Sequence, residues 1–168
     1  LTGTTVLFYP IQHPLEPETT QNETFNLATQ MGGVAFPAGT RSVLFIGRQG
    51  TGPYCYGDGA PCSDLCDGSK GTHAYPYRHQ IWAYDANDLL AVKNGSAQPW
   101  AIRPYAIWAL SDIDSSGCAA ISGAAYDPTT GRLYVAADYG DEPIIHVYAI
   151  DRVGVSLDRR LALPALLR

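Results

Sequence analysis

Side chains suited to ligand binding are concentrated between positions 71 and 79 of this chain. The stretch Gly71-Thr-His-Ala-Tyr-Pro-Tyr-Arg-His79 contains two histidines, two tyrosines and an arginine. Tyrosine rings stack on sugar rings, and arginine and histidine form directional hydrogen bonds. The pattern predicts a surface that binds carbohydrate or protein. The residues expected to form it are Arg48, Tyr54, His73, Tyr75, Tyr77 and Arg78. The alternative is that these aromatic side chains pack beneath the neighbouring loop.

That neighbouring loop, residues 50–71, is rich in glycine and cysteine and is expected to be an insert held by disulfides. The four cysteines are Cys55, Cys62, Cys66 and Cys118. An even number of clustered cysteines favours disulfides, and therefore a secreted, extracellular or periplasmic protein. Four cysteines permit three pairings. Cys62–Cys66 and the combination of Cys55–Cys66 with Cys62–Cys118 are both open.

The insert also carries residues of the types that bind metal ions. Asp58, Asp64 and Asp67 supply the carboxylate oxygens that Ca²⁺ prefers, although their spacing differs from that of an EF-hand loop. A solvated loop without a metal is the alternative. Cys62, Cys66 and His73 are zinc-ligand types, but the surrounding sequence is typical of a secreted protein with disulfides. We expect no cofactor other than this calcium candidate.

Carboxylates elsewhere permit an enzymatic alternative, a hydrolase or lyase acting on glycans. Asp138, Asp141 and His73 are its candidate acid–base groups, since glycoside hydrolysis uses paired carboxylates. The chain has no Gly-x-Ser-x-Gly elbow, no phosphate-binding glycine-rich loop and no His-Glu-x-x-His motif. The sequence therefore favours a binding or structural module over an enzyme and assigns no catalytic residue.

Composition narrows the class of protein and of partner. Of the 168 residues, 46% are apolar and 16% are charged, which is typical of a globular chain. The net charge of −5 gives no reason to expect nucleic-acid binding. No apolar run approaches the roughly 20 residues that cross a bilayer, so we expect no membrane insertion. Asn22 and Asn94 begin sequons, and they are candidate glycosylation sites.

The elements that must position these residues are mainly β-strands. Strands are expected at 4–9, 34–36, 42–47, 79–85, 104–110, 120–126, 132–137 and 144–150, from their β-branched and aromatic content. Residues 161–167 are expected to form a fourth strand or a short helix, and 11–30 a long loop. Residues 85–92 are expected to form a helical turn or a wide turn capped by Asp85. A tight turn is expected at 127–131, where Gly131 tolerates positive φ.

Two stretches of the chain share one pattern of strand, turn and strand. Gly33-Val-Ala-Phe-Pro-Ala-Gly-Thr-Arg-Ser-Val-Leu-Phe-Ile-Gly47 matches the region from Gly123 to Ala136. Phe36 aligns with Tyr126 at an offset of 90, and Phe45 with Tyr134 at an offset of 89. The next strand aligns Tyr84 with Ile150 at an offset of 66, because the first unit carries the insert. The pattern predicts a repeated sheet module.

The second unit resembles the inner strands of β-propeller blades. The run Tyr126-Asp-Pro-Thr-Thr-Gly-Arg-Leu-Tyr-Val135 resembles the blade pattern YDPxTGxLYV, and the later run Val147-Tyr-Ala-Ile-Asp151 resembles the blade ending VxxYD. Secreted propeller-like proteins of unassigned function share these features. The resemblance implies an all-β fold of antiparallel four-stranded modules, with blades at about 33–110 and 121–163 in one domain or fragment, 1–168. Because propellers close with four to eight blades, it also implies self-association or additional blades from a longer chain.

Overall fold

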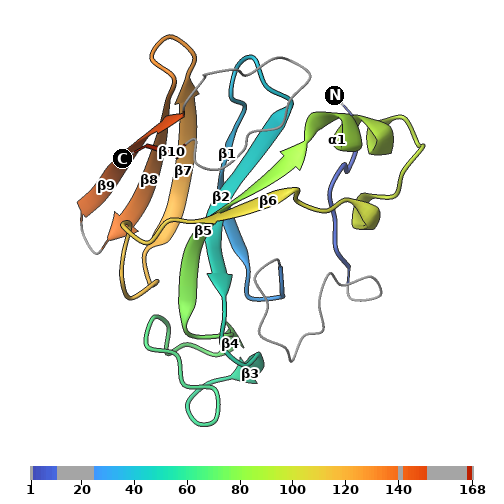
Figure 1. Ribbon diagram of the computed structural model, residues 1–168. Helices are drawn as coiled ribbons and strands as arrows, with labels where there is room; N and C mark the ends of the chain where they lie inside the picture. The colour runs from blue at the N-terminus through green and yellow to red at the C-terminus, as the bar shows by residue number, and fades with distance from the viewer. Residues whose placement is uncertain (1, 11–24, 140–141, 151–165, 168) are drawn as a thin grey trace.

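The computed structural model describes residues 2–10, 25–139, 142–150 and 166–167 (Figure 1). It is an all-β fold with one short α-helix. The first sheet is an antiparallel meander of β1 (Gln30–Ala35), β2 (Ser42–Gly50), β5 (Tyr77–Asp85) and β6 (Ala106–Ala109). The second sheet contains β7 (Ala120–Asp127), β8 (Arg132–Tyr139), β9 (Glu142–Ile150) and β10 (Leu166–Leu167). A separate hairpin of β3 (Cys55–Gly57) and β4 (Gly71–His73) lies within the insert.

The main hydrophobic core lies between the two sheets. Leu44, Ile46 and Ile81 of the first sheet are fully buried against Leu133 and Val135 of the second. β1 packs against β7, and the sheets diverge from this line of contact (Figure 1). Burying branched side chains from both sheets in one layer is the main stabilisation expected for such a pair, at about 25 cal/mol per Å² of apolar area.

The two sheets have the same strand register when the second is compared with the first at a shift of 90 residues. Gln30 pairs with Arg48, and Ala120 pairs with Asp138. The first strand of each sheet also has a bulge at the equivalent place, between Met31 and Gly33 in β1 and between Ile121 and Gly123 in β7. For the third strands the shift is 64, since Ser42 pairs with Asp85 and Arg132 with Ala149. The repeated module is therefore confirmed as two equivalent meanders.

The expected offsets of 89 and 66 are wrong by one and two residues. The register makes Val135 the equivalent of Phe45, and Tyr148 the equivalent of Tyr84. Matching Phe45 to Tyr134 aligned two aromatic residues that point to opposite faces of their sheets. A shift of one residue reverses the face of every side chain, so the corrected register decides which faces are equivalent.

With the corrected register, the sheets pack head to tail. The first-sheet residues in the shared core are Ala35, Leu44, Ile46, Ile81 and Ala83. Their equivalents are Ala125, Tyr134, Ala136, Ile145 and Val147, on the face of the second sheet that points away from this core. The second-sheet residues in the core are instead equivalent to the outer face of the first sheet. The two sheets thus meet through faces that are not equivalent to each other in the repeat.

The outer face of the first sheet is covered. Trp82 and Tyr84 are fully buried there, in a cluster with Val92 of α1 (Ala86–Lys93) and with Ile102, which follows the 3₁₀ turn η1 (Pro99–Ala101). The hydroxyl of Tyr9 donates to the Ile102 carbonyl at 2.7 Å and lies 2.9 Å from the hydroxyl of Tyr84. Residues 4–9 therefore cover this face, but the expected strand there is wrong. They have no ladder partner, and the Tyr9 side chain holds them instead.

Local signals predicted the turn and the helix correctly. Gly131 adopts φ 71°, and the Asp127 carboxylate accepts from the Thr129 N–H at 2.8 Å. Asp85 caps α1 by accepting from the Asn87 N–H at 2.9 Å, so the helical alternative holds for that segment. At the tail, residues 166–167 pair with β9 as a fourth strand. Most of the expected loop at 11–30 lies outside the described residues.

Candidate functional site

The insert is tied to the rest of the chain by disulfides. Cys55 bonds to Cys62 within it, and Cys66 bonds to Cys118 in the connection between β6 and β7. Both pairings considered from the sequence, Cys62–Cys66 and Cys55–Cys66 with Cys62–Cys118, are wrong. The partner of Cys66 lies 52 residues further along the chain, so this pairing leaves no local pattern in the sequence. The zinc alternative is also wrong, because Cys62 and Cys66 are oxidised in different disulfides.

A buried ion pair lies at the base of the insert. The Asp64 carboxylate is 3.0 Å from Nδ1 of His73, and both side chains are almost completely buried. The same carboxylate accepts from the Tyr77 hydroxyl at 2.5 Å and from the Cys66 N–H at 2.7 Å. Nε2 of His73 faces the carbonyl oxygens of Ser69 and Gly57, at 3.0 and 3.2 Å. Every polar atom of this pair therefore has a partner.

These contacts determine the protonation of both groups. Both ring nitrogens of His73 face acceptors, and this arrangement favours the doubly protonated imidazolium. The hydrogen bond to Asp64 raises the pKa of His73, against the opposing effect of burial. Burial favours a raised pKa for Asp64, yet hydrogen bonds from Tyr77, the Cys66 backbone and His73 outweigh it and lower that pKa. Burial and the bond to Asp64 raise the pKa of Tyr77 to about 12.

Arg48 links the base of the insert to β1 and to the connection that precedes β7. Its guanidinium lies over the Tyr77 ring, 4.5 Å from the ring centre. It donates to Gln30 of β1 at 2.8 Å and to the carbonyl of Cys118 at 2.9 Å. The connection that carries Cys118 is itself fixed by Asp114. Burial opposes the shift, but hydrogen bonds from the Ser116 hydroxyl and from three backbone N–H groups lower the pKa of Asp114 to about 2.

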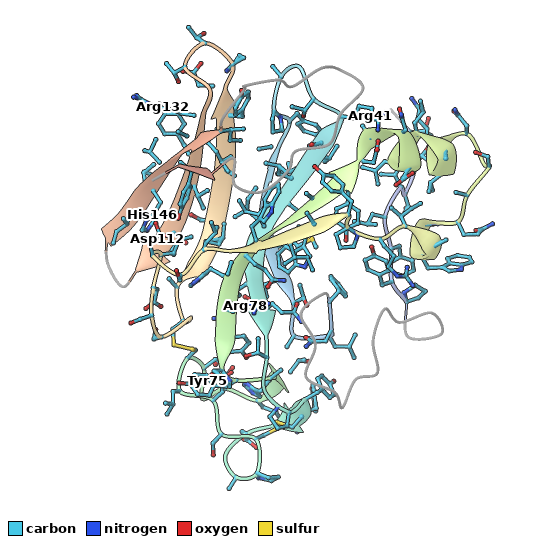
Figure 2. All side chains as sticks on the ribbon, in the orientation of Figure 1. Arg41, Tyr75, Arg78, Asp112, Arg132 and His146 are labelled. Atoms are coloured by element: carbon cyan, nitrogen blue, oxygen red, sulfur yellow. A yellow bond between two sulfur atoms is a disulfide. The ribbon has the colours of Figure 1, made fainter. Side chains whose placement is uncertain are left out.

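The structure divides the predicted binding residues into two groups. Arg48, His73 and Tyr77 are at least nine-tenths buried with internal partners, as the alternative of packing beneath the loop requires. Tyr54, Tyr75 and Arg78 are half-buried and reach the surface, and we call these three residues the insert rim (Figure 2 labels Tyr75 and Arg78). Backbone hydrogen bonds from Thr51 and Gly52 to residues 76 and 74 hold the two chain segments of the rim side by side.

Tyr77 supports Tyr75 of the insert rim, and Gln80 supports Arg78. The Tyr75 ring packs edge-on against Tyr77, with ring centres 6.1 Å apart. Arg78 donates from Nε and Nη2 to the Gln80 side chain at 3.1 and 2.9 Å, which fixes the direction of its guanidinium. A partly exposed tyrosine and a fixed guanidinium can stack on and hydrogen-bond to a polar ligand.

Two exposed apolar residues of the insert were missed by sequence reasoning. Leu65 is 81% exposed and Tyr56 is 68% exposed. The residues on either side of Leu65, Asp64 and Cys66, both make buried contacts. These contacts hold the backbone of Leu65 in place. Large apolar side chains that are exposed to solvent on an ordered backbone are common in protein-binding surfaces.

The structure shows no metal centre among the residues it describes. No group of three or more His, Cys, Asp or Glu side chains lies close enough to hold an ion in those ranges. Asp64 is used by His73 and Tyr77, Asp67 accepts from the Ser69 N–H at 2.8 Å, and Asp58 is exposed. The calcium site at these three aspartates stays a prediction from the sequence.

The other candidate residues lie apart from the insert rim. Asp138 is exposed at the end of β8, and Asp141 lies outside the described residues. Asn94 is exposed in the turn after α1, where a glycan has room, whereas Asn22 also lies outside the described residues.

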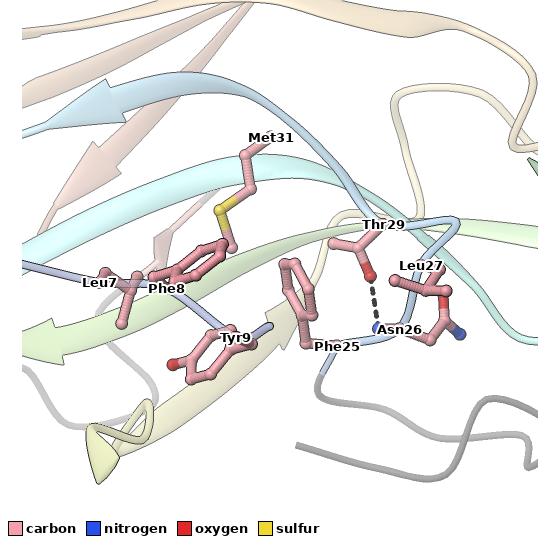
Figure 3. Close-up of a pocket in the computed structure, with 8 residues that line it drawn as sticks. All are labelled: Leu7, Phe8, Tyr9, Phe25, Asn26, Leu27, Thr29 and Met31. Atoms are coloured by element: carbon pink, nitrogen blue, oxygen red, sulfur yellow. Dashed lines mark hydrogen bonds between the residues drawn. The ribbon is translucent and has the colours of Figure 1, made fainter. Parts of the chain in front are cut away.

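A separate apolar pocket of about 320 Å³ lies beside the first sheet (Figure 3). Its lining includes Leu7, Phe8, Tyr9, Phe25 and Met31. The chain between Tyr9 and Phe25 is mostly outside the described residues, so we assign no ligand to this pocket.

No helix in the described ranges is long and apolar enough to cross a membrane. Comparisons with known proteins add no relative from which a role could be transferred. No family model, curated protein or solved structure matches the chain. Any function must therefore be argued from the insert and the sheets themselves.

Proposed function

We propose that this protein is an extracellular binding module whose insert rim, Tyr54, Tyr75 and Arg78, engages carbohydrate. One observation carries the proposal. The chain fixes a surface loop with two disulfides, a buried ion pair and a guanidinium stacked on Tyr77. A loop fixed before binding loses little conformational entropy when a ligand binds, which is the general advantage of preorganisation.

The head-to-tail order of the sheets supports a propeller-like architecture for this module. Successive blades of a propeller are related in this way, each with one face to the blade before and one to the blade after. The two disulfides are compatible with an oxidising, extracellular compartment. In such an arrangement the loops at one end of the blades form the ligand surface, and the insert is the longest described loop of the first sheet.

A protein ligand is the second candidate, and Leu65 and Tyr56 favour it. Sugars are bound mainly by aromatic and polar side chains, whereas an aliphatic side chain that is 81% exposed suits a protein partner. The two candidates use different residues of the same insert, so variants can separate them.

Binding is better supported than hydrolysis or lysis of glycans. The enzymatic alternative needs His73 as an acid–base group, but both of its ring nitrogens are engaged by Asp64, Ser69 and Gly57. A general acid or base must reach the proton that it transfers. Of the other two candidates, Asp138 is exposed at the end of β8, and Asp141 lies outside the described residues.

The test is to screen the purified chain on a glycan array and on an array of extracellular proteins. Tyr75→Ala should abolish glycan signals, and Leu65→Ser should abolish protein signals. Phe36→Ala is the matched control, because Phe36 is an aromatic residue that is 64% exposed at a different turn. Signals that survive both insert variants, or no signal on either array, would refute the proposal.

A further inference from the structure

The outward face of the second sheet repeats an interface that the first sheet buries, and no described residue covers it. Its members are Ala125, Tyr134, Ala136, Ile145 and Val147, the register equivalents of first-sheet core residues. Ile145 is 54% exposed and Val147 is 48% exposed, whereas Ile81 and Ala83 at the equivalent positions are fully buried. No described residue buries these two side chains. We call this surface the open face.

From this face we infer that two copies of the chain pair through their open faces as a symmetric dimer. The opposite end of the molecule cannot supply the partner surface. There the outer face of the first sheet is covered by Tyr9, α1 and Ile102. A molecule covered at one end and open at the other can bury its open face against an identical one, which closes the assembly at two copies.

The charges at the ends of β8 select one orientation of the two copies. Arg132 and Asp138 lie on the open face, at opposite ends of this strand, and both are exposed. A two-fold axis along the strands would place Arg132 against the partner's Arg132. An axis across the strands, level with Val135, instead places Arg132 against the partner's Asp138. Opposite charges therefore favour the crossed axis.

The same axis also matches the apolar side chains by size and position. It places Tyr134 opposite the partner's Ala136, a large residue against a small one. Ile145 then faces the partner's Val147. Large and small side chains at facing positions allow two layers to interdigitate. Three strands of eight or nine residues, about 26 Å long, present about 400 Å² per copy. The total of about 800 Å² is below the size of a standard interface, so the dimer is a weak one that should dissociate on dilution.

Sedimentation velocity over a concentration series of the 168-residue chain tests this inference. The mass should rise from 18.1 kDa toward twice that value with concentration. Ile145→Asp should keep the chain monomeric throughout. Phe36→Asp, which places the same charge at an exposed position off the open face, should leave the dimer unchanged.

Charge reversal is the second part of the experiment, and it tests the orientation of the two copies in the dimer. Arg132→Asp alone and Asp138→Arg alone should each weaken the dimer about tenfold, because each places like charges together. The double variant should restore the dissociation constant of the original chain. A chain that stays monomeric at all concentrations, oligomers larger than a dimer, or a dimer insensitive to both sets of variants would overturn the proposal. The inference does not depend on the insert rim or on its ligand.

Discussion

At the Asp64 carboxylate, donors from three directions converge on one buried group. Tyr77, the Cys66 backbone and His73 all donate to it. The sequence offered Asp64 as a calcium ligand because it is one of three carboxylates in a short loop. Composition cannot distinguish a carboxylate that binds a metal from one that pairs with a histidine nine residues later, because the distinction depends on how the hairpin folds.

Asp64→Asn should destabilise the protein by about 3 kcal/mol, since it leaves the charged His73 buried without its counter-ion. Urea denaturation would measure the loss. Asp58→Asn is the control, because Asp58 is exposed in the same insert and should change stability by no more than about 0.5 kcal/mol. Equal effects of the two variants would contradict the buried pair.

The pair also predicts how stability depends on pH. The pKa of His73 is raised in the folded state, so its contribution is complete below about 6.5 and is lost as the pH rises through the folded value. The pKa of Asp64 is lowered, so its contribution is present above about 3.9 and is lost as the pH falls through the folded value. The free energy of unfolding should therefore fall above pH 6.5 in the original chain.

Asp64→Asn serves as the reference for this pH dependence. It keeps His79, whose pKa is lowered by burial, and it removes the charge beside both His73 and Tyr77. Because the pKa of Tyr77 is about 12, His73 is the one of these two groups that titrates between pH 5 and 9. The difference in unfolding free energy between the two proteins should shrink as the pH rises above 6.5. A difference that is constant from pH 5 to 9 would contradict an imidazolium at His73.

At the scale of the elements, signals carried by neighbouring residues were the ones that predicted structure. Asp85 predicted the start of α1, and Gly131 predicted the turn between β7 and β8. The strand expected at 4–9 failed because a strand needs a partner, and the available position was over Trp82 and Tyr84 rather than at a sheet edge. The predictions of the disulfide pairing and of a ligand-binding Arg48 were wrong for the same reason. Both depend on residues distant in sequence.

The two disulfides should differ in their contribution to stability. Cys66–Cys118 spans 52 residues, and Cys55–Cys62 spans 7. Loop-closure entropy predicts a loss of about 4 kcal/mol for Cys66→Ser with Cys118→Ser, and about 2.5 kcal/mol for Cys55→Ser with Cys62→Ser. Thermal unfolding of the double variants measures the order. A larger loss for the short loop would contradict the view that the long disulfide stabilises the fold by fixing the insert to the connection between β6 and β7.

At the scale of the whole molecule, the repeat was visible in sequence but its faces were not. Aligning Phe45 with Tyr134 found both hairpins, yet it reversed the faces of β8. Aromatic residues occur on both sides of these sheets, so an alignment by residue type cannot choose between them. The register could be determined only from the strand pairs of the structure. It shows the head-to-tail packing of the two sheets, which composition does not predict.

A pair of equivalent glycines tests that order. Gly33 faces the second sheet, where an added Cβ would lie 2.7 Å from the Cβ of Ala124. Gly123, the residue 90 positions later, has nothing within 4 Å of the same atom. Gly33→Ala should cost about 2 kcal/mol in urea denaturation, because the sheets must separate slightly, and Gly123→Ala about 0.5 kcal/mol or less. Equal costs would mean that the two faces are not in opposite environments.

The central claim is that the insert rim binds ligand in the form in which the disulfides and the ion pair hold it. Amide chemical-shift mapping of the isotope-labelled chain, titrated with the ligand found on the arrays, tests it most directly. The account predicts that shifts concentrate at Tyr54, Tyr75 and Arg78, with small changes at His73 and Tyr77 beneath them. Shifts centred on the open face around Ile145, or spread evenly over the chain, would contradict it.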